Sequence, residues 1–191
     1  MDNIMLCIGD SLTFGYGVPK NKCWLTLLDE SSNIKVINRG INGDTTPSML
    51  NRLYEDLILY KPNMVFIMGG TNDLLCGRKV SNIIENLEDM ILDCKNLNCK
   101  IFIGIPPIII KEMAENLFMP SQLYDYCNNN LSTLRESLIT LCNKQNIRFI
   151  DFYTLSKNNL ANDIFIDGIH LNYKGNKLMK EEALRVINYF S

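Results

Sequence analysis

The sequence predicts an α/β fold in which a five-stranded parallel sheet lies between layers of helices. Short apolar runs alternate along the chain with longer segments whose apolar residues recur at helical spacing, which is typical of repeated strand–helix units. The 191 residues fall within the usual size of one globular domain, and no Pro-, Gly- or Ser-rich linker divides them. We therefore expect a single domain over residues 1–191.

The predicted strands are runs rich in Ile, Val and Phe, most of which end at glycine, proline or polar residues. They cover Asn3–Ile8, Ile34–Asn38, Asn63–Met68, Lys100–Ile105 and Ile147–Phe152. The predicted helices cover Trp24–Asp29, Ser48–Tyr60, Val80–Leu97, Gln122–Cys142 and Tyr173–Phe190. One apolar stripe, which we expect to face the core, is formed by Ile83, Leu87, Met90, Ile91 and Cys94.

The charge and hydropathy patterns exclude several classes of partner. The formal net charge is -2, so the chain has no bias toward a polyanion, and we expect no nucleic-acid partner. The longest uncharged apolar run, Ile101–Ile110, is well short of the roughly 18 residues that indicate a membrane span. We expect a monomer or a weak homo-oligomer with no membrane span.

The N-terminus and the cysteines indicate a location. Met1 leads directly into the first predicted strand, which leaves no room for a signal peptide. The seven cysteines are odd in number, scattered, and without a C-x-x-C pair. We therefore expect reduced thiols and a cytoplasmic protein. With a single histidine in the chain, we expect no metal site.

A polar motif follows the first predicted strand. In an open α/β sheet, ligands bind beyond the carboxyl ends of the strands. The motif GDSLT, residues 9–13, would place Ser11 at a strand-to-helix turn, where a nucleophilic serine needs to be. A helix cap is the better interpretation of an isolated G-D-S tripeptide. Thr13 replaces the second glycine of G-x-S-x-G, so the larger α/β-hydrolase fold is not indicated.

A second motif, DGIHL at residues 167–171, precedes the last predicted helix. At this spacing the Asp167 carboxylate could accept a hydrogen bond from one ring nitrogen of His170 and leave the other free to take the serine proton. Because the chain has one histidine, a histidine base can only be His170. The alternative is that Asp167 and Gly168 are turn residues and His170 lies on the surface or at the helix entry.

Two more loops could supply hydrogen-bond donors. In GGTND, residues 69–73, the Asn72 amide could donate to charge developing on a substrate carbonyl oxygen, although a helix cap is equally consistent with the motif. In the loop after the second strand, the Gly43 amide could be another donor, although a turn followed by a cap is the better interpretation in isolation. Taken together with Ser11, Asp167 and His170, these groups form the full set that acyl transfer requires.

The blocks GDSLTFGYG, NRGINGDTT, GGTND and DGIHL resemble those of the SGNH hydrolases, also called GDSL esterases and lipases, in the family's order and over nearly the whole chain. The resemblance implies a flavodoxin-like three-layer α/β/α sandwich that needs no cofactor. It implies Ser11 as the nucleophile, a triad completed by Asp167 and His170, and an oxyanion hole made by Ser11, Gly43 and Asn72. The compact length and the run INGDTT are most similar to small bacterial acyl thioesterases, lysophospholipases and arylesterases.

The resemblance predicts hydrolysis of a small acyl ester, thioester or lysolipid. The apolar stretch Pro106–Met119, with Ile108 and Ile109, is the best candidate for a wall of the acyl pocket, and a helix packed on the sheet is an equally good interpretation. Other residues expected to line the cleft are Tyr16, Leu74 and Leu75. A carbohydrate O-deacetylase and a non-catalytic carbohydrate- or lipid-binding protein remain alternatives. A nucleotide- or flavin-binding module is disfavoured because G-x-x-x-x-G-K-[ST] is absent.

Overall fold

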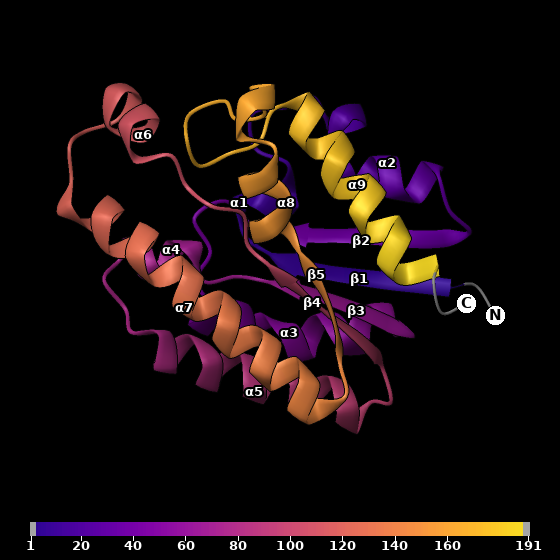
Figure 1. The fold of residues 1–191 in the computed structure, drawn as a ribbon. Coiled ribbons are helices and arrows are strands. Elements are labelled where there is room, and N and C mark those ends of the chain that lie inside the picture. The colour runs from indigo at the N-terminus through magenta and orange to yellow at the C-terminus, as the bar shows by residue number, and fades with distance from the viewer. Residues whose placement is uncertain (1–2, 189–191) are drawn as a thin grey trace.

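A sheet of five parallel strands forms the centre of the computed structural model, which describes residues 3–188 (Figure 1). In spatial order the strands are β2 (Ile34–Gly40), β1 (Asn3–Gly9), β3 (Met64–Met68), β4 (Lys100–Ile105) and β5 (Arg148–Asp151). This confirms the predicted α/β class and the five predicted strands. The chain leaves β1 toward one edge to form β2 and then returns to the other side of β1 with β3, so the strand order reverses at β1.

Helices cover both faces of the sheet (Figure 1). One face is covered by α3 (Thr46–Tyr60), α5 (Val80–Asn96) and α7 (Gln122–Gln145). The other face is covered by α1 (Ser11–Phe14), α2 (Trp24–Glu30), α8 (Phe152–Asn158) and α9 (Tyr173–Asn188). The remaining elements are α4 (Thr71–Leu75), α6 (Lys111–Leu117) and the short 3₁₀ helices η1 (Lys20–Lys22) and η2 (Leu160–Asn162). The layers therefore make an α/β/α sandwich.

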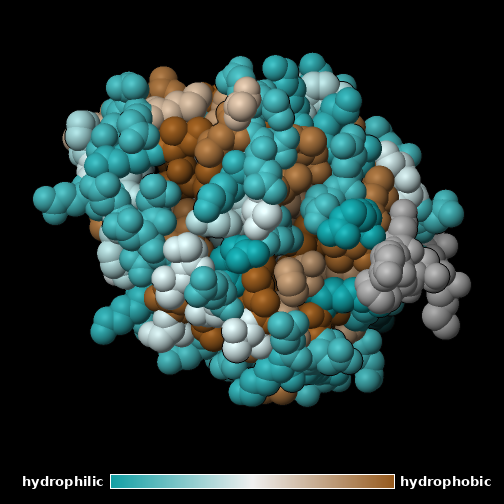
Figure 2. All heavy atoms as spheres, viewed as in Figure 1, coloured by the Kyte–Doolittle hydropathy of each residue, from teal (hydrophilic) through white to brown (hydrophobic). Residues whose placement is uncertain are grey.

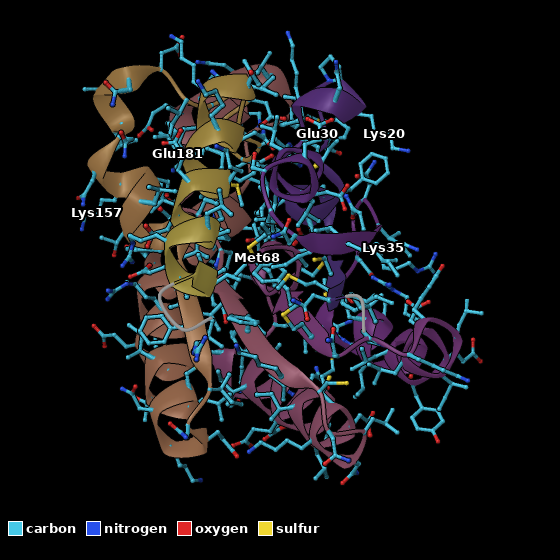
Figure 3. All side chains as sticks on the ribbon, turned by 90° about the vertical axis from the view of Figure 1, so that its right-hand side faces the viewer. Lys20, Glu30, Lys35, Met68, Lys157 and Glu181 are labelled. Carbon is cyan, nitrogen blue, oxygen red and sulfur yellow. The ribbon has the colours of Figure 1, made fainter. Side chains whose placement is uncertain are left out.

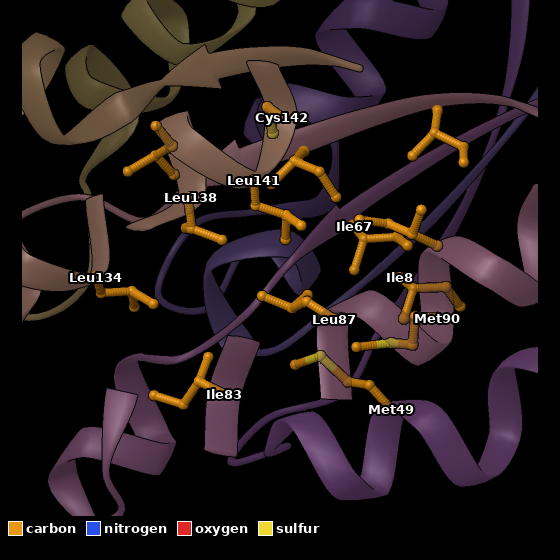
Figure 4. Packing of buried hydrophobic residues seen from close by; sticks show 14 of the residues in the cluster. Ile8, Met49, Ile67, Ile83, Leu87, Met90, Leu134, Leu138, Leu141 and Cys142 are labelled. Atoms are coloured by element: carbon orange, nitrogen blue, oxygen red, sulfur yellow. The ribbon is translucent and has the colours of Figure 1, made fainter. Parts of the chain in front are cut away.

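The two cores follow from the alternation of side chains along each strand. Leu6 and Ile8 of β1 belong to the core under α3, α5 and α7, whereas Met5 and Cys7 belong to the core on the opposite face. The close-up shows how this first core is filled by side chains from strands and helices, among them Ile8 and Met90 (Figure 4). All five residues of the predicted apolar stripe on α5 are buried there, as expected.

Local hydrogen bonds explain where the structure departs from the predicted elements. Phe152 was expected in the last strand, but the Asp151 side chain accepts from the Thr154 amide at 3.0 Å and caps α8, so Phe152 begins a helix. The short helices α1 and α4 were not predicted either, because so few residues carry no clear periodicity. The predicted C-terminal helix is α9, and Phe190 lies outside the described residues.

On the face of the molecule that Figure 2 shows, hydrophilic residues predominate, with apolar residues visible in patches between them. Charged side chains such as Lys35, Lys157 and Glu181 are exposed, whereas Met68 on β3 is fully buried (Figure 3). Among residues 3–188, no helix is long and apolar enough to cross a membrane.

Candidate active site

Ser11 lies at a sharp turn just beyond β1. Asp10 caps α1 by accepting from the Leu12 amide at 2.9 Å, and Ser11 is the first residue of that helix. A Cβ atom at Gly9 would lie 2.1 Å from the Thr13 hydroxyl oxygen, so the turn requires glycine. As the first helical residue, Ser11 has an amide with no intrahelical acceptor. Its side chain and its amide are therefore both available at the end of the sheet.

Asp167 and His170 form a compact turn before α9. One carboxylate oxygen of Asp167 accepts from the backbone amides of Ile169 at 2.9 Å and His170 at 2.7 Å. The other lies 2.7 Å from Nδ1 of His170. Burial by itself raises the pKa of Asp167, but the hydrogen bonds from the His170 ring and from the two amides outweigh it and hold the pKa below its usual value. The carboxylate is thus kept in its charged form.

The same histidine reaches the serine. Nε2 of His170 lies 2.8 Å from Oγ of Ser11, so Asp167, His170 and Ser11 form one continuous hydrogen-bonded chain. With a proton on Nδ1 donated to Asp167, Nε2 is the acceptor for the serine hydroxyl. This arrangement can remove a proton from Ser11 and stabilise the resulting imidazolium. The local alternatives, a simple helix cap and a surface histidine, do not account for it.

The register of the sheet brings the loops after β1, β2 and β3 to one edge. Gly9 at the end of β1 is paired with Gly40 on β2 and with Met68 on β3. Figure 1 shows α1 and α4, which follow β1 and β3, at the end of the sheet to which the β2 arrow points. Groups from three separate parts of the chain therefore meet beside Ser11.

Two of these groups have a hydrogen-bond donor to spare. Gly43 has a φ of +77° in a turn closed by a bond from the Asp44 amide to the Ile41 carbonyl, and its own amide has no acceptor within residues 3–188. Asn72 of α4 donates one amide hydrogen to the Asp44 carbonyl at 2.9 Å. The second hydrogen of that amide has no partner in the described part of the chain. Gly43 and Asn72 are thus linked through Asp44.

Of the residues expected to bind substrate, Tyr16 lies beside the proposed nucleophile, whereas Leu74 and Leu75 pack against the core. The Tyr16 ring packs on the His170 ring with 4.4 Å between centroids, and Tyr16 lines a narrow pocket with Ser11. Leu74 was expected to line the cleft, but this is wrong because the short helix α4 directs its side chain into the core, where it is 0% exposed. Leu75 is half-buried and packs against the same core.

Ile108 and Ile109 line a pocket of about 290 Å³ together with Tyr153 and Leu160. Ser11 and His170 line a different, smaller pocket. The segment after Ile110 forms α6, in agreement with the helical interpretation of this stretch. A contact of Ile108 or Ile109 with substrate therefore stays a prediction.

Sequence reasoning missed the residues that hold the Gly43 loop. The Asp73 carboxylate accepts from the backbone amide of Thr46 at 3.0 Å and from its hydroxyl at 2.8 Å, and both residues are buried. This pair ties the end of the Gly43 loop to α4. Both residues lie in motifs that the sequence analysis quoted, Thr46 in NRGINGDTT and Asp73 in GGTND. Local patterns do not reveal that these two residues bind each other.

Asp10 is a second feature that the sequence did not disclose. It is 1% exposed, and burial raises its pKa from 3.8 to about 7, although the Leu12 amide and the nearby His170 partly oppose the shift. The carboxylates of Asp73 and Asp44 add to the increase in the pKa of Asp10.

In the part of the chain that the structure describes, no group of three His, Cys, Asp or Glu side chains is arranged to hold a metal ion.

Comparison with known proteins shows the family to which this chain belongs. The model of the GDSL-like Lipase/Acylhydrolase family matches residues 7–178, and this chain therefore belongs to that family. The matched range includes Ser11, Gly43, Asn72, Asp167 and His170. The family resemblance found in the sequence motifs is confirmed.

Two relatives of known name are similar to part of this chain. An arylesterase of Vibrio mimicus is 37% identical over 122 residues, a segment that covers 60% of this chain and 61% of the relative. The thioesterase 1/protease 1/lysophospholipase L1 of Escherichia coli strain K12 is 33% identical over 98 residues, which cover 50% of this chain and 47% of the relative. The chain thus matches less than two thirds of either relative's length.

Solved structures match over nearly the full length. A member of the lipolytic protein G-D-S-L family from Veillonella parvula superimposes with a TM-score of 0.83 at 26% identity, covering 97% of this chain and 98% of that one. The psychrotrophic esterase EstA from Pseudoalteromonas sp., in a structure inhibited by monoethylphosphonate, superimposes with a TM-score of 0.78 at 25% identity, covering 99% and 98%. The fold is therefore that of GDSL hydrolases.

Proposed function

We propose that this protein is a serine hydrolase that cleaves ester or thioester bonds of small acyl or lipid substrates through an acyl-enzyme on Ser11. The observation that carries the proposal is the hydrogen-bonded chain from Asp167 through His170 to Ser11, with distances of 2.7 and 2.8 Å. Membership of the GDSL-like lipase/acylhydrolase family supports it. The names of the relatives, an arylesterase and a thioesterase/lysophospholipase, support the choice of bonds.

The first half of the reaction forms the acyl-enzyme. Oγ of Ser11 attacks the substrate carbonyl carbon while its proton moves to Nε2 of His170. The carbonyl oxygen becomes an oxyanion that accepts hydrogen bonds from the Ser11 and Gly43 amides and the free amide hydrogen of Asn72. Asp167 stabilises the imidazolium. When the tetrahedral intermediate collapses, the bond to the alcohol or thiol breaks and the leaving group takes the proton from His170.

The second half releases the acid. A water molecule attacks the acyl carbon and gives a proton to Nε2 of His170, and the same donors hold the second oxyanion. The bond between the acyl carbon and Ser11 then breaks, and the Ser11 oxygen recovers its proton from His170. The products are a carboxylic acid and the unchanged enzyme, so each step uses only groups of this chain, substrate and water.

We further propose that the chain works as one domain, as a monomer or weak homo-oligomer, in the reducing cytoplasm. All seven cysteines are free, and Cys7, Cys94, Cys127 and Cys142 are buried. Burial raises the pKa of each of these four thiols, which disfavours the reactive thiolate. Size-exclusion chromatography with light scattering, with and without reductant, tests this: a stable oligomer or a requirement for oxidant would contradict it.

A fluorophosphonate probe tests the proposed nucleophile. We expect covalent labelling of wild-type protein at Ser11, located by peptide mass spectrometry, and loss of labelling in Ser11→Ala. Ser132→Ala, an exposed position on α7, is the matched control and should label like the wild type. A folded wild-type protein that the probe leaves unlabelled would overturn the nucleophile.

A substrate panel then defines the bond that is cleaved. Wild-type protein is given p-nitrophenyl esters of graded length, acyl-CoA thioesters, a lysophospholipid and an acetylated sugar, with Ser11→Ala as the blank. We expect Ser11-dependent turnover of esters and thioesters. Turnover restricted to the acetylated sugar would favour a carbohydrate O-deacetylase, and Ser11 labelling without any turnover would favour a ligand-binding protein on this fold.

A further inference from the structure

Arg52 of α3 lies behind the loop that carries Gly43, and its side chain is only 17% exposed. Its Nε donates to Oδ2 of Asp44 at 3.0 Å, and one terminal nitrogen donates to the same oxygen at 2.8 Å. That terminal nitrogen also donates to the Gly9 carbonyl at 3.3 Å. One guanidinium group therefore bridges the end of β1 and the loop after β2.

These contacts lie next to all three proposed oxyanion donors. Gly9 is two residues before Ser11, and Asp44 directly follows Gly43. The backbone carbonyl of Asp44 accepts from the side chain of Asn72, which orients that amide. Arg52 thus contacts the two segments that supply the Ser11 and Gly43 amides. It also contacts Asp44, the residue whose carbonyl orients the third donor, Asn72.

Charge burial makes the Asp44 side chain dependent on this contact. Asp44 is 8% exposed, and its carboxylate lies in a region that also holds the buried Asp10 and Asp73. A buried carboxylate that loses its cation is strongly unfavourable, so the Gly43–Asp44 turn would shift toward water if Arg52 were removed. Arg52 itself is held by Asp56, which Arg39 also binds.

We propose that Arg52 is a positioning residue of the proposed hydrolase, and that it holds the Gly43–Asp44 turn against the Ser11 turn so that the three donors face one oxyanion. The inference rests on the proposed function. The planar guanidinium reaches Asp44 and Gly9 together, whereas the single ammonium of a lysine cannot reproduce that fork. The competing interpretation is that Arg52 only stabilises the fold.

The variant Arg52→Lys keeps the charge and removes the fork. We expect kcat for a p-nitrophenyl ester to fall about 10- to 100-fold while KM stays close to the wild-type value, because misplaced donors weaken transition-state binding more than ground-state binding. The matched control is Arg135→Lys. Arg135 of α7 binds Oδ2 of Asp151, at the end of β5, at 2.9 and 2.8 Å and so makes a similar ion pair. Arg135→Lys should leave kcat unchanged.

A double-mutant cycle separates positioning from stability. If Arg52 acts through the oxyanion donors, the fold reduction in kcat caused by Arg52→Lys should be much smaller in an Asn72→Ala background than in the wild type. Additive effects, or an Arg52→Lys kcat equal to that of Arg135→Lys, would overturn the inference. If Arg52→Lys does not fold, Asp44→Asn tests the same link from the other side and should lower kcat with little change in KM.

The two proposals can fail separately. If the fluorophosphonate does not label Ser11 in the wild type, the proposed function fails, and the inference about Arg52 fails with it. If the wild type and Arg135→Lys are labelled and active, and Arg52→Lys matches them in kcat, only the role of Arg52 is rejected.

Discussion

Nε2 of His170 lies 2.8 Å from Oγ of Ser11, although 159 residues separate the two along the chain. Ser11 is placed by the end of β1 and the start of α1, and His170 by the turn that Asp167 closes before α9. Each residue is held by its own local hydrogen bonds. Their contact therefore depends on how the two ends of the chain are brought together by the sheet.

Removing either partner of this contact should abolish the proposed reaction. We expect Ser11→Ala and His170→Ala each to lower kcat by about 10⁴- to 10⁶-fold, and the double variant to lose little more, because the two residues act as a unit. Steady-state hydrolysis of a p-nitrophenyl ester measures this, with circular dichroism as the check on folding. Near-wild-type turnover in either variant would reject the assignment.

Removing the Asn72 side chain should weaken oxyanion binding without removing the nucleophile. We expect Asn72→Ala to lower kcat by about 10²- to 10³-fold, the usual cost of one oxyanion donor. The wild-type Asn72 also donates to Asp44 at 2.9 Å. Asn130→Ala, which removes a side-chain bond to the Tyr126 carbonyl on α7, is the matched control and should retain its kcat. Equal rates in the two variants would argue against Asn72 as a donor.

Gly168 should not tolerate a side chain. Its φ is +85°, and a Cβ atom would lie 2.4 Å from the Ile110 carbonyl oxygen. We expect Gly168→Ala to destabilise the fold by roughly 1–3 kcal/mol and to lower kcat, because the strained turn also sets the position of Asp167 and His170. Urea unfolding and ester hydrolysis measure the two effects.

Gly77 provides a control for Gly168. It also has a positive φ, of +74°, but a Cβ atom there would meet only Leu123 at 3.5 Å. Gly77→Ala should therefore lose stability through backbone strain alone and keep its kcat. If Gly168→Ala behaves in the same way, the packing against Ile110 does not position the histidine.

Asp10 should make stability depend on pH. Burial raises its pKa from 3.8 to about 7, so folding favours the protonated carboxyl. This contribution to stability is fully present below the unfolded pKa and is lost as pH rises through about 7. Asp10→Asn keeps a side-chain oxygen to cap α1 but cannot ionise. We expect its free energy of unfolding, relative to wild type, to rise by on the order of 4 kcal/mol between pH 4 and pH 8.

Urea unfolding at several pH values measures this difference. Asp163→Asn, at an exposed position, is the control and should give a pH dependence parallel to that of the wild type. Parallel curves for Asp10→Asn and wild type would mean that Asp10 stays ionised in the folded protein. Because Asp10 adjoins Ser11, ester hydrolysis by the same variant shows whether its charge also affects the reaction.

Local patterns predicted the strands and the long helices. The central strands β1, β3 and β4 bury both faces, so each appears in the sequence as an apolar run. Each long helix buries one stripe, as Leu87 and Met90 do on α5. The polar motifs after the strands were recognisable for a similar reason, because a parallel sheet brings the carboxyl ends of its strands to one edge. Ser11 was therefore found without coordinates, and His170 was found because it is the one histidine in the sequence.

Tertiary packing decided the rest. Leu74 has the same local character as a cleft residue, and only the packing of α4 against α7 shows that it is buried. Arg52 is an ordinary helical arginine until the fold brings Asp44 and Gly9 to its guanidinium. The sequence by itself determined which residue types follow each strand, whereas the tertiary structure decided which of them contact one another. The physical reason is that desolvation and hydrogen-bond geometry depend on neighbours far away in the chain.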